Sequence, residues 1–146
     1  MVARILLNWA TTRVAPTGTH IITKVFSTPL HKYLIKLPEA ILDYPFGPEA
    51  AVYKIEGKVF AITVEGRINL KCDPVHAQEL RAVFSEVTPG YQMNKKHWNT
   101  LDLTGDLPKS EIHRQIDHSY DLIVKKLPKA TKQRLRILYE RLAWLK

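Results

Sequence analysis

The stretch AVYKIEGKVFAITVEGRINLKC, residues 51–72, decides the fold of this chain. Three strand-like segments, 51–56, 59–64 and 68–72, are separated by the turns Glu56-Gly57-Lys58 and Glu65-Gly66-Arg67. The outer segments alternate in period two, and the middle segment is almost continuously apolar, which is typical of a central strand. Glycine at each turn supplies the backbone freedom that a tight connection needs. The stretch therefore predicts an antiparallel meander.

Helices are expected before and after this meander in the sequence. Ser27-Thr28-Pro29 and Asp73-Pro74 each place a capping side chain directly before a proline, which is a common start of a helix. A returning strand is expected over 98–103, and a long helix from Pro108 that breaks or kinks at Pro128. The order helix, meander, helix, strand, helix predicts an α+β fold, with an antiparallel sheet whose helices pack on one face.

The chain of 146 residues fits one domain with short extensions. We expect an irregular N-terminal extension over 1–26, an α+β domain over 27–128, and a basic amphipathic helix over 129–146. The last segment carries a stripe of leucines at helical spacing, namely Leu135, Leu138, Leu142 and Leu145. Such a stripe packs either on the domain or on a second subunit.

The net charge of +8 is concentrated at the two ends of the chain. Residues 1–24 carry +3 and residues 125–146 carry +7, whereas residues 25–124 carry −2. Attraction to phosphates grows with the number of cationic contacts that a protein makes. A strong electrostatic attraction to a polyanion is therefore expected from the C-terminal segment.

The sequence indicates a cytoplasmic protein. Its single cysteine, Cys72, excludes an internal disulfide framework and is compatible with a reducing compartment. No apolar run approaches the roughly 20 residues that cross a bilayer, and the apolar start Ile5-Leu6-Leu7 is cut short by Asn8, so no secretory signal is expected.

Several segments, taken in order, carry a resemblance to a known family. They are Leu37-Pro38-Glu39 through Asp43-Tyr44-Pro45-Phe46-Gly47, then Met93 through Thr100, Gly105 through Pro108, Ile116 through Tyr120, and Lys126 through Lys129. In order and spacing these segments resemble the MmcQ/YjbR family over roughly residues 28–130.

The resemblance implies a fold of the type of CyaY, the bacterial frataxin, and a small DNA-binding domain with a "double-wing" arrangement of β-elements. The family usually begins just before its first helix, so residues 1–24 have no counterpart in it. We expect translation of the native protein to begin near Val25.

Lys95-Lys96-His97-Trp98-Asn99 is the first candidate for nucleic-acid binding. The two lysines suit phosphate oxygens, an indole stacks on bases, and an amide both donates and accepts at a base edge. The alternative is that Trp98 fills the core and Asn99 caps a turn.

The outward face of the sheet gives a second set of candidates, and two of them stand at the glycine turns that correspond to wing tips. The set consists of Lys54, Lys58, Arg67 and Lys71. Long cationic side chains on hairpins suit contacts to a nucleic-acid backbone. An ordinary solvated face is the alternative, since Glu56 and Glu65 flank the same turns and repel phosphate.

The sequence offers no catalytic or metal-binding pattern and implies no cofactor. Cys72, Asp73 and His76 lie close together, but no third group completes a nucleophile and base. Asp117 and Asp121 share a helical face, as solvated carboxylates often do. The first helix carries Lys32 and Lys36 where frataxins present acids, so the shared fold does not imply iron chemistry.

The sequence thus predicts a non-enzymatic DNA-binding domain, a monomer or homodimer. The alternative is a protein- or small-ligand-interaction module without nucleic-acid binding.

Overall fold

The computed structural model describes residues 28–144, and the side chains up to Arg141. The expected extension over 1–26 and Leu145 lie outside the described residues, as does the side chain of Leu142. The elements are α3 (Pro29–Lys36), β1 (Ile41–Asp43), β2 (Ala51–Ile55), β3 (Lys58–Val64), β4 (Arg67–Lys71), α4 (Pro74–Val83), β5 (Val87–Pro89), β6 (Trp98–Asp102), α5 (Lys109–Val124) and α6 (Lys129–Trp144).

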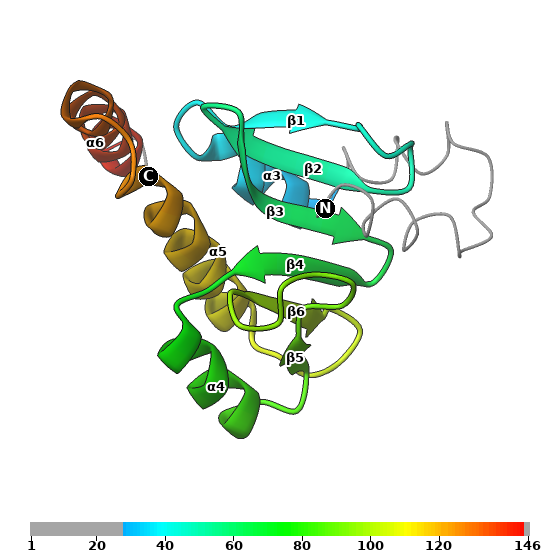
Figure 1. Ribbon diagram of the computed structural model, residues 1–146. Helices are drawn as coiled ribbons and strands as arrows, with labels where there is room; N and C mark the ends of the chain where they lie inside the picture. The colour runs from blue at the N-terminus through cyan, green and yellow to red at the C-terminus, as the bar shows by residue number, and fades with distance from the viewer. Residues whose placement is uncertain (1–27, 145–146) are drawn as a thin grey trace.

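The strands form one antiparallel sheet in the order β1-β2-β3-β4-β6-β5 (Figure 1). The predicted meander is confirmed as β2, β3 and β4, with β3 between its two neighbours. The short edge strands β1 and β5 were not expected, because three residues ending in Asp43 or Pro89 carry no readable alternation.

Both predicted caps are confirmed. The Thr28 hydroxyl accepts from the His31 N–H at 3.2 Å, and the Asp73 carboxylate accepts from the N–H groups of Val75 and His76. Pro29 and Pro74 occupy the first helical position, where no backbone donor is lost.

The main core lies between the sheet and the helices. The helix α5 packs across β3 and β4 (Figure 1), and Ser119 on α5 donates to the Phe60 carbonyl of β3 at 2.5 Å. All four helices of the described chain contribute buried side chains to this core, among them Leu34, Leu80, Ile116 and Leu135. The predicted α+β fold with helices on one sheet face is therefore confirmed.

The opposite face of the sheet carries a second, smaller apolar cluster. Val52, Ile62 and Val64 are buried there together with Met93 and Trp98. Since β3 is covered on both faces, its sequence is apolar at successive positions instead of alternating.

Candidate nucleic-acid interface

Three lysines converge at one end of the sheet. Lys58 is the first residue of β3 and Lys71 is the last residue of β4, and antiparallel pairing places these two strand ends side by side. Lys126 follows the C-terminal end of α5, the helix that packs across the same two strands. We call Lys58, Lys71 and Lys126 the basic end.

The electrostatics of Lys71 report this convergence. Its pKa is lowered by burial first, and then by the charges of Lys126 and Lys58. Lys71 is half-buried, whereas Lys58 and Lys126 are exposed. Ammonium groups that repel one another favour the binding of an anion, because a negative charge between them removes the repulsion.

Within the segment Lys95–Asn99, residues 95–97 form a turn that leads into β6, and Trp98 and Asn99 are the first residues of that strand. The Asn94 carboxamide oxygen accepts from the N–H groups of Lys96 and His97, at 2.9 and 3.3 Å. The His97 carbonyl accepts from the Cys72 N–H at 2.8 Å, just beyond Lys71. This places the exposed Lys96 and the half-buried His97 at the same sheet end as the basic end.

Trp98 and Asn99 belong to the core, and the prediction that they contact a base is wrong. Trp98 is 9% exposed within the second cluster, and Asn99 is 1% exposed. Arg81 on α4 fixes both residues: its Nε donates to the Asn99 side-chain oxygen at 2.7 Å, and its Nη2 donates to the Trp98 carbonyl at 3.2 Å. The Arg81 Nη2 also donates to the Lys95 carbonyl. The alternative that the sequence left open, an indole in the core, is the correct one.

The remaining candidates are separated or occupied. Arg67 begins β4 at the opposite end from Lys71, with its guanidinium 5.9 Å from the centre of the Tyr91 ring and Asp102 opposite it on β6. Lys54 forms an ion pair with Asp43 at 3.1 Å, and the Lys95 ammonium donates to the Gly90 carbonyl. The structure therefore does not bring the two glycine turns to one surface.

The helix α6 weakens the repulsion between Glu56, at the β2–β3 turn, and a phosphate, which the sequence predicted. Arg134 forms ion pairs with Glu39 at 2.9 Å and with Glu56 at 3.1 Å. The negative charge of Glu56, which lies two residues before Lys58, is thereby partly offset. The sequence had placed Arg134 and Lys126 at the C-terminal end of the chain without a partner on the sheet, because only tertiary packing brings them there.

Cys72 does not have the properties of a catalytic nucleophile. It is buried, and burial, followed by the charge of Asp73, raises the pKa of its thiol to about 11. A thiol that stays protonated is a poor nucleophile.

The rings of His76 and His118 meet edge to face with their centres 5.1 Å apart, and the Asp73 N–H donates to Nε2 of His118 at 3.2 Å. Within residues 28–144, no three His, Cys, Asp or Glu side chains gather as metal ligands. None of the helices described is long and apolar enough to cross a bilayer.

Comparison with known proteins agrees with this architecture. The YjbR family model matches residues 35–122, more than half of the chain. The chain belongs to the YjbR family. A YjbR-family relative, the uncharacterised protein YbdF of Escherichia coli O157:H7, is 37% identical over 106 residues, which cover 70% of this chain and 87% of YbdF. The uncharacterised protein YjbR of Escherichia coli K12 is 38% identical over 91 residues, which cover 60% of this chain and 77% of YjbR.

Two solved structures share the fold of this family member. A Deinococcus radiodurans protein, DR2400, superposes with a TM-score of 0.67 at 33% identity, covering 73% of this chain and 84% of the other. A Pseudomonas syringae protein superposes with a TM-score of 0.56 at 30% identity, covering 62% of this chain and 92% of the other. The resemblance noted in the sequence is therefore confirmed as family membership.

Proposed function

We propose that this protein binds DNA through its phosphates, without catalysing a reaction, and that the basic end is the contact surface. The observation that carries the proposal is the geometry of the sheet end, where the start of β3, the end of β4 and the C-terminal end of α5 bring Lys58, Lys71 and Lys126 together. The pKa of Lys71, lowered by burial and then by the charges of Lys126 and Lys58, supports it. Exposed Lys96 at the same sheet end extends the surface. The DNA-binding function that the family resemblance implies points in the same direction.

Lysine suits a phosphate backbone better than a base edge in this setting. It is a compact point charge on a flexible stem and carries no planar fork for bidentate recognition. The side chains that were candidates for reading bases, Trp98 and Asn99, are buried. Binding is therefore expected to depend strongly on salt and weakly on DNA sequence.

The test is fluorescence anisotropy with a labelled duplex and a labelled single strand over a range of salt concentrations. For a protein that neutralises three duplex phosphates, the logarithm of the affinity falls with the logarithm of salt with a slope of roughly −3. Lys58→Gln, Lys71→Gln and Lys126→Gln are each expected to weaken binding and to reduce that slope by about one.

Lys109→Gln is the matched control, because it removes the same charge from the other end of α5. The 16 residues of α5 span about 24 Å. No binding at low salt refutes the proposal. An effect of Lys109→Gln as large as that of the basic-end variants refutes the assignment of the surface.

We further propose that the protein acts in the cytoplasm, as a monomer or a homodimer. Cys72 is free and buried, which fits a reducing compartment. Fractionation of cells that carry the chromosomally tagged protein checks the location, and recovery outside the cytoplasmic fraction contradicts it.

A further inference from the structure

One hydroxyl group ties together the elements that form the basic end. The Lys71 N–H donates to the Ser119 Oγ at 2.9 Å, and that hydroxyl donates to the Phe60 carbonyl at 2.5 Å. The end of β4 is thereby joined to β3 and to α5. Because Ser119 is fully buried, these hydrogen bonds are shielded from water and hold the backbone of Lys71 in a fixed place.

The other two lysines of the basic end come from the same neighbouring elements. Lys58 lies two residues before Phe60 on β3, so its side chain leaves the same face of the sheet as Phe60, which packs in the main core. Lys126 lies about two helical turns after Ser119, in the turn that follows α5. Burial lowers the pKa of Lys71 first, and the charges of Lys126 and Lys58 lower it further. The three ammonium groups therefore meet in one place.

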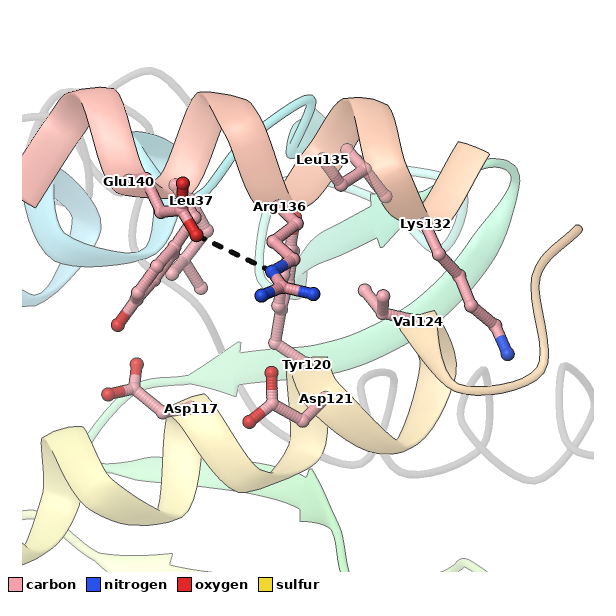
Figure 2. A pocket seen from close by; sticks show the side chains of 10 residues that line it. Leu37, Asp117, Tyr120, Asp121, Val124, Lys132, Leu135, Arg136 and Glu140 are labelled. Carbon is pink, nitrogen blue, oxygen red and sulfur yellow. Dashed lines mark hydrogen bonds and ion pairs between the residues drawn. The ribbon is translucent and has the colours of Figure 1, made fainter. Parts of the chain in front are cut away.

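The arginines of α6 do not extend the basic end into a longer basic track. Arg134 is paired with two glutamates. Arg136 pairs along its own helix with Glu140 at 3.4 Å, and Figure 2 shows its guanidinium directed toward α5 and the carboxylate of Asp121. The positive charge of both arginines is thus partly offset by acids of the same domain. The basic end is a compact group of cations.

Acids also stand next to the basic end along the chain. Glu56 lies two residues before Lys58, Asp73 lies two residues after Lys71, and residues 25–124 as a whole carry −2. A duplex that passes over the site brings further phosphates toward these acids, since double-stranded DNA carries one negative charge per about 1.7 Å of its axis. A compact cationic site beside acids therefore favours a ligand whose charge is concentrated in one group.

A phosphate monoester concentrates its charge in this way. At pH 7 it carries about −1.5 to −2 and offers three acceptor oxygens, whereas a phosphodiester within a strand carries a single negative charge. A phosphate at the end of a DNA strand is such a monoester. Together with the first phosphodiester it carries roughly three negative charges, which match the three lysines of the basic end.

We propose that the basic end binds the terminal phosphate of a DNA strand, with Lys71 at the centre of the site and Lys58 and Lys126 beside it. Each ammonium group donates to a phosphate oxygen, and such charge-assisted hydrogen bonds are roughly twice as strong as neutral ones. End recognition rests on the proposed DNA binding and narrows it to one part of the DNA. A free mononucleotide carries the same monoester, so the experiment separates these two sources of the ligand.

The test is fluorescence anisotropy with a DNA hairpin that carries its label in the loop, so that its one end is free. The hairpin carries a 5′ phosphate, a 3′ phosphate or only hydroxyl groups at its termini, and a closed dumbbell with the same stem has no end. We expect a terminal phosphate to raise the affinity roughly tenfold over the hydroxyl hairpin and the dumbbell, because only it adds charge-assisted hydrogen bonds. A preference for one of the two termini supports end recognition and assigns its polarity.

Two variants assign the site. Lys71→Gln is expected to remove most of the tenfold preference, and Lys126→Gln, at an exposed position, to reduce it roughly threefold. Lys109→Gln removes the same charge at the other end of α5 and is expected to retain the full preference. Urea denaturation of each variant shows whether the fold is retained. Deoxyadenosine monophosphate is expected to displace the phosphorylated hairpin far less effectively than the same hairpin without a label.

The outcomes separate end recognition from DNA binding itself. Equal affinity for all four DNAs overturns end recognition and leaves the proposed DNA binding intact, whereas no binding to any of them overturns both. A full preference that persists in Lys71→Gln and Lys126→Gln refutes the basic end as the site. Displacement by deoxyadenosine monophosphate as effective as that by the unlabelled hairpin makes the ligand a free nucleotide, and this also overturns the proposal.

Discussion

Gly90 shows how a single residue positions the turn that leads into β6. Its N–H donates to the Trp98 carbonyl at 2.8 Å. A Cβ atom at this position would lie 2.7 Å from the Trp98 Cβ and 3.0 Å from the Trp98 carbonyl oxygen. The close approach of these two backbones requires a residue without a side chain, and it fixes the indole in the second cluster.

We therefore expect Gly90→Ala to destabilise the protein by about 1–3 kcal/mol, the usual cost of overpacking a rigid site. Urea denaturation measures this change. Gly105→Ala is the matched control, because its added Cβ would meet the Glu86 side chain, which can move away. Equal stability of the two variants would contradict the requirement for glycine at position 90.

His118 makes the stability depend on pH. Burial lowers its pKa first, His76 lowers it further, and the opposing charge of Asp73 outweighs that of Lys125. The unfolded chain binds this proton with a pKa of about 6.5. Because the folded pKa is lower, stability is lost as the pH falls from about 6.5 through the folded pKa, and no further below it.

Replacing His118 by glutamine is expected to make the loss of stability between about pH 7 and about pH 5 smaller. The glutamine side chain retains an oxygen that accepts from the Asp73 N–H. Urea denaturation at several pH values checks this, with His97→Gln as the control for removing a histidine elsewhere. An unchanged pH dependence in His118→Gln would exclude this residue as its source.

At the scale of elements, α6 is part of the domain and is not a loose basic tail. Leu135 is 2% exposed and belongs to the main core, and Arg134 joins the helix to residues that follow α3 and β2. The first leucine of the stripe therefore packs on the domain itself. In the described part of the chain, Leu135 holds α6 against the main core.

Leu135→Ala is expected to destabilise the protein by about 2–5 kcal/mol, as the loss of a buried leucine usually does. Ile137→Ala on the same helix is the control, since Ile137 is 52% exposed. The measurement is the free energy of unfolding in urea. A change below about 0.5 kcal/mol for Leu135→Ala, the usual size for a surface position, would mean that α6 does not dock in solution.

At the scale of the whole molecule, charges from distant parts of the chain act on one surface. Arg134 and Glu56 are 78 residues apart in sequence, and their ion pair partly offsets the charge of the acid beside Lys58. The proposed DNA surface thus depends on the docking of the last helix. Surface pairs contribute little to stability, so the expected effect is on binding.

Arg134→Gln is expected to weaken DNA binding more than Lys109→Gln, although both remove one positive charge. The first variant also releases Glu39 and Glu56 close to the basic end, where their charges repel phosphate. Fluorescence anisotropy at low salt provides the comparison. If the two variants bind DNA equally well, Arg134 has no electrostatic influence on the surface.

The sequence by itself determined the meander, the two capped helices and the family. These follow from local physics: period-two alternation, a capping side chain before a proline, and glycine at turns. The separation of the two glycine turns also follows from the sequence. Consecutive turns of a meander lie at opposite ends of the middle strand, about 20 Å apart for β3, so Lys58 and Arg67 are separated by topology alone.

Only the tertiary structure decided which polar residues meet and which are covered. The sequence was compatible with Trp98 and Asn99 as contact residues or as buried residues. Burial depends on what packs against a side chain and not on its type alone. The convergence of Lys58, Lys71 and Lys126 likewise joins residues that are far apart in the chain. Local sequence patterns carry no information about such distances, which are set by how the helices pack on the sheet.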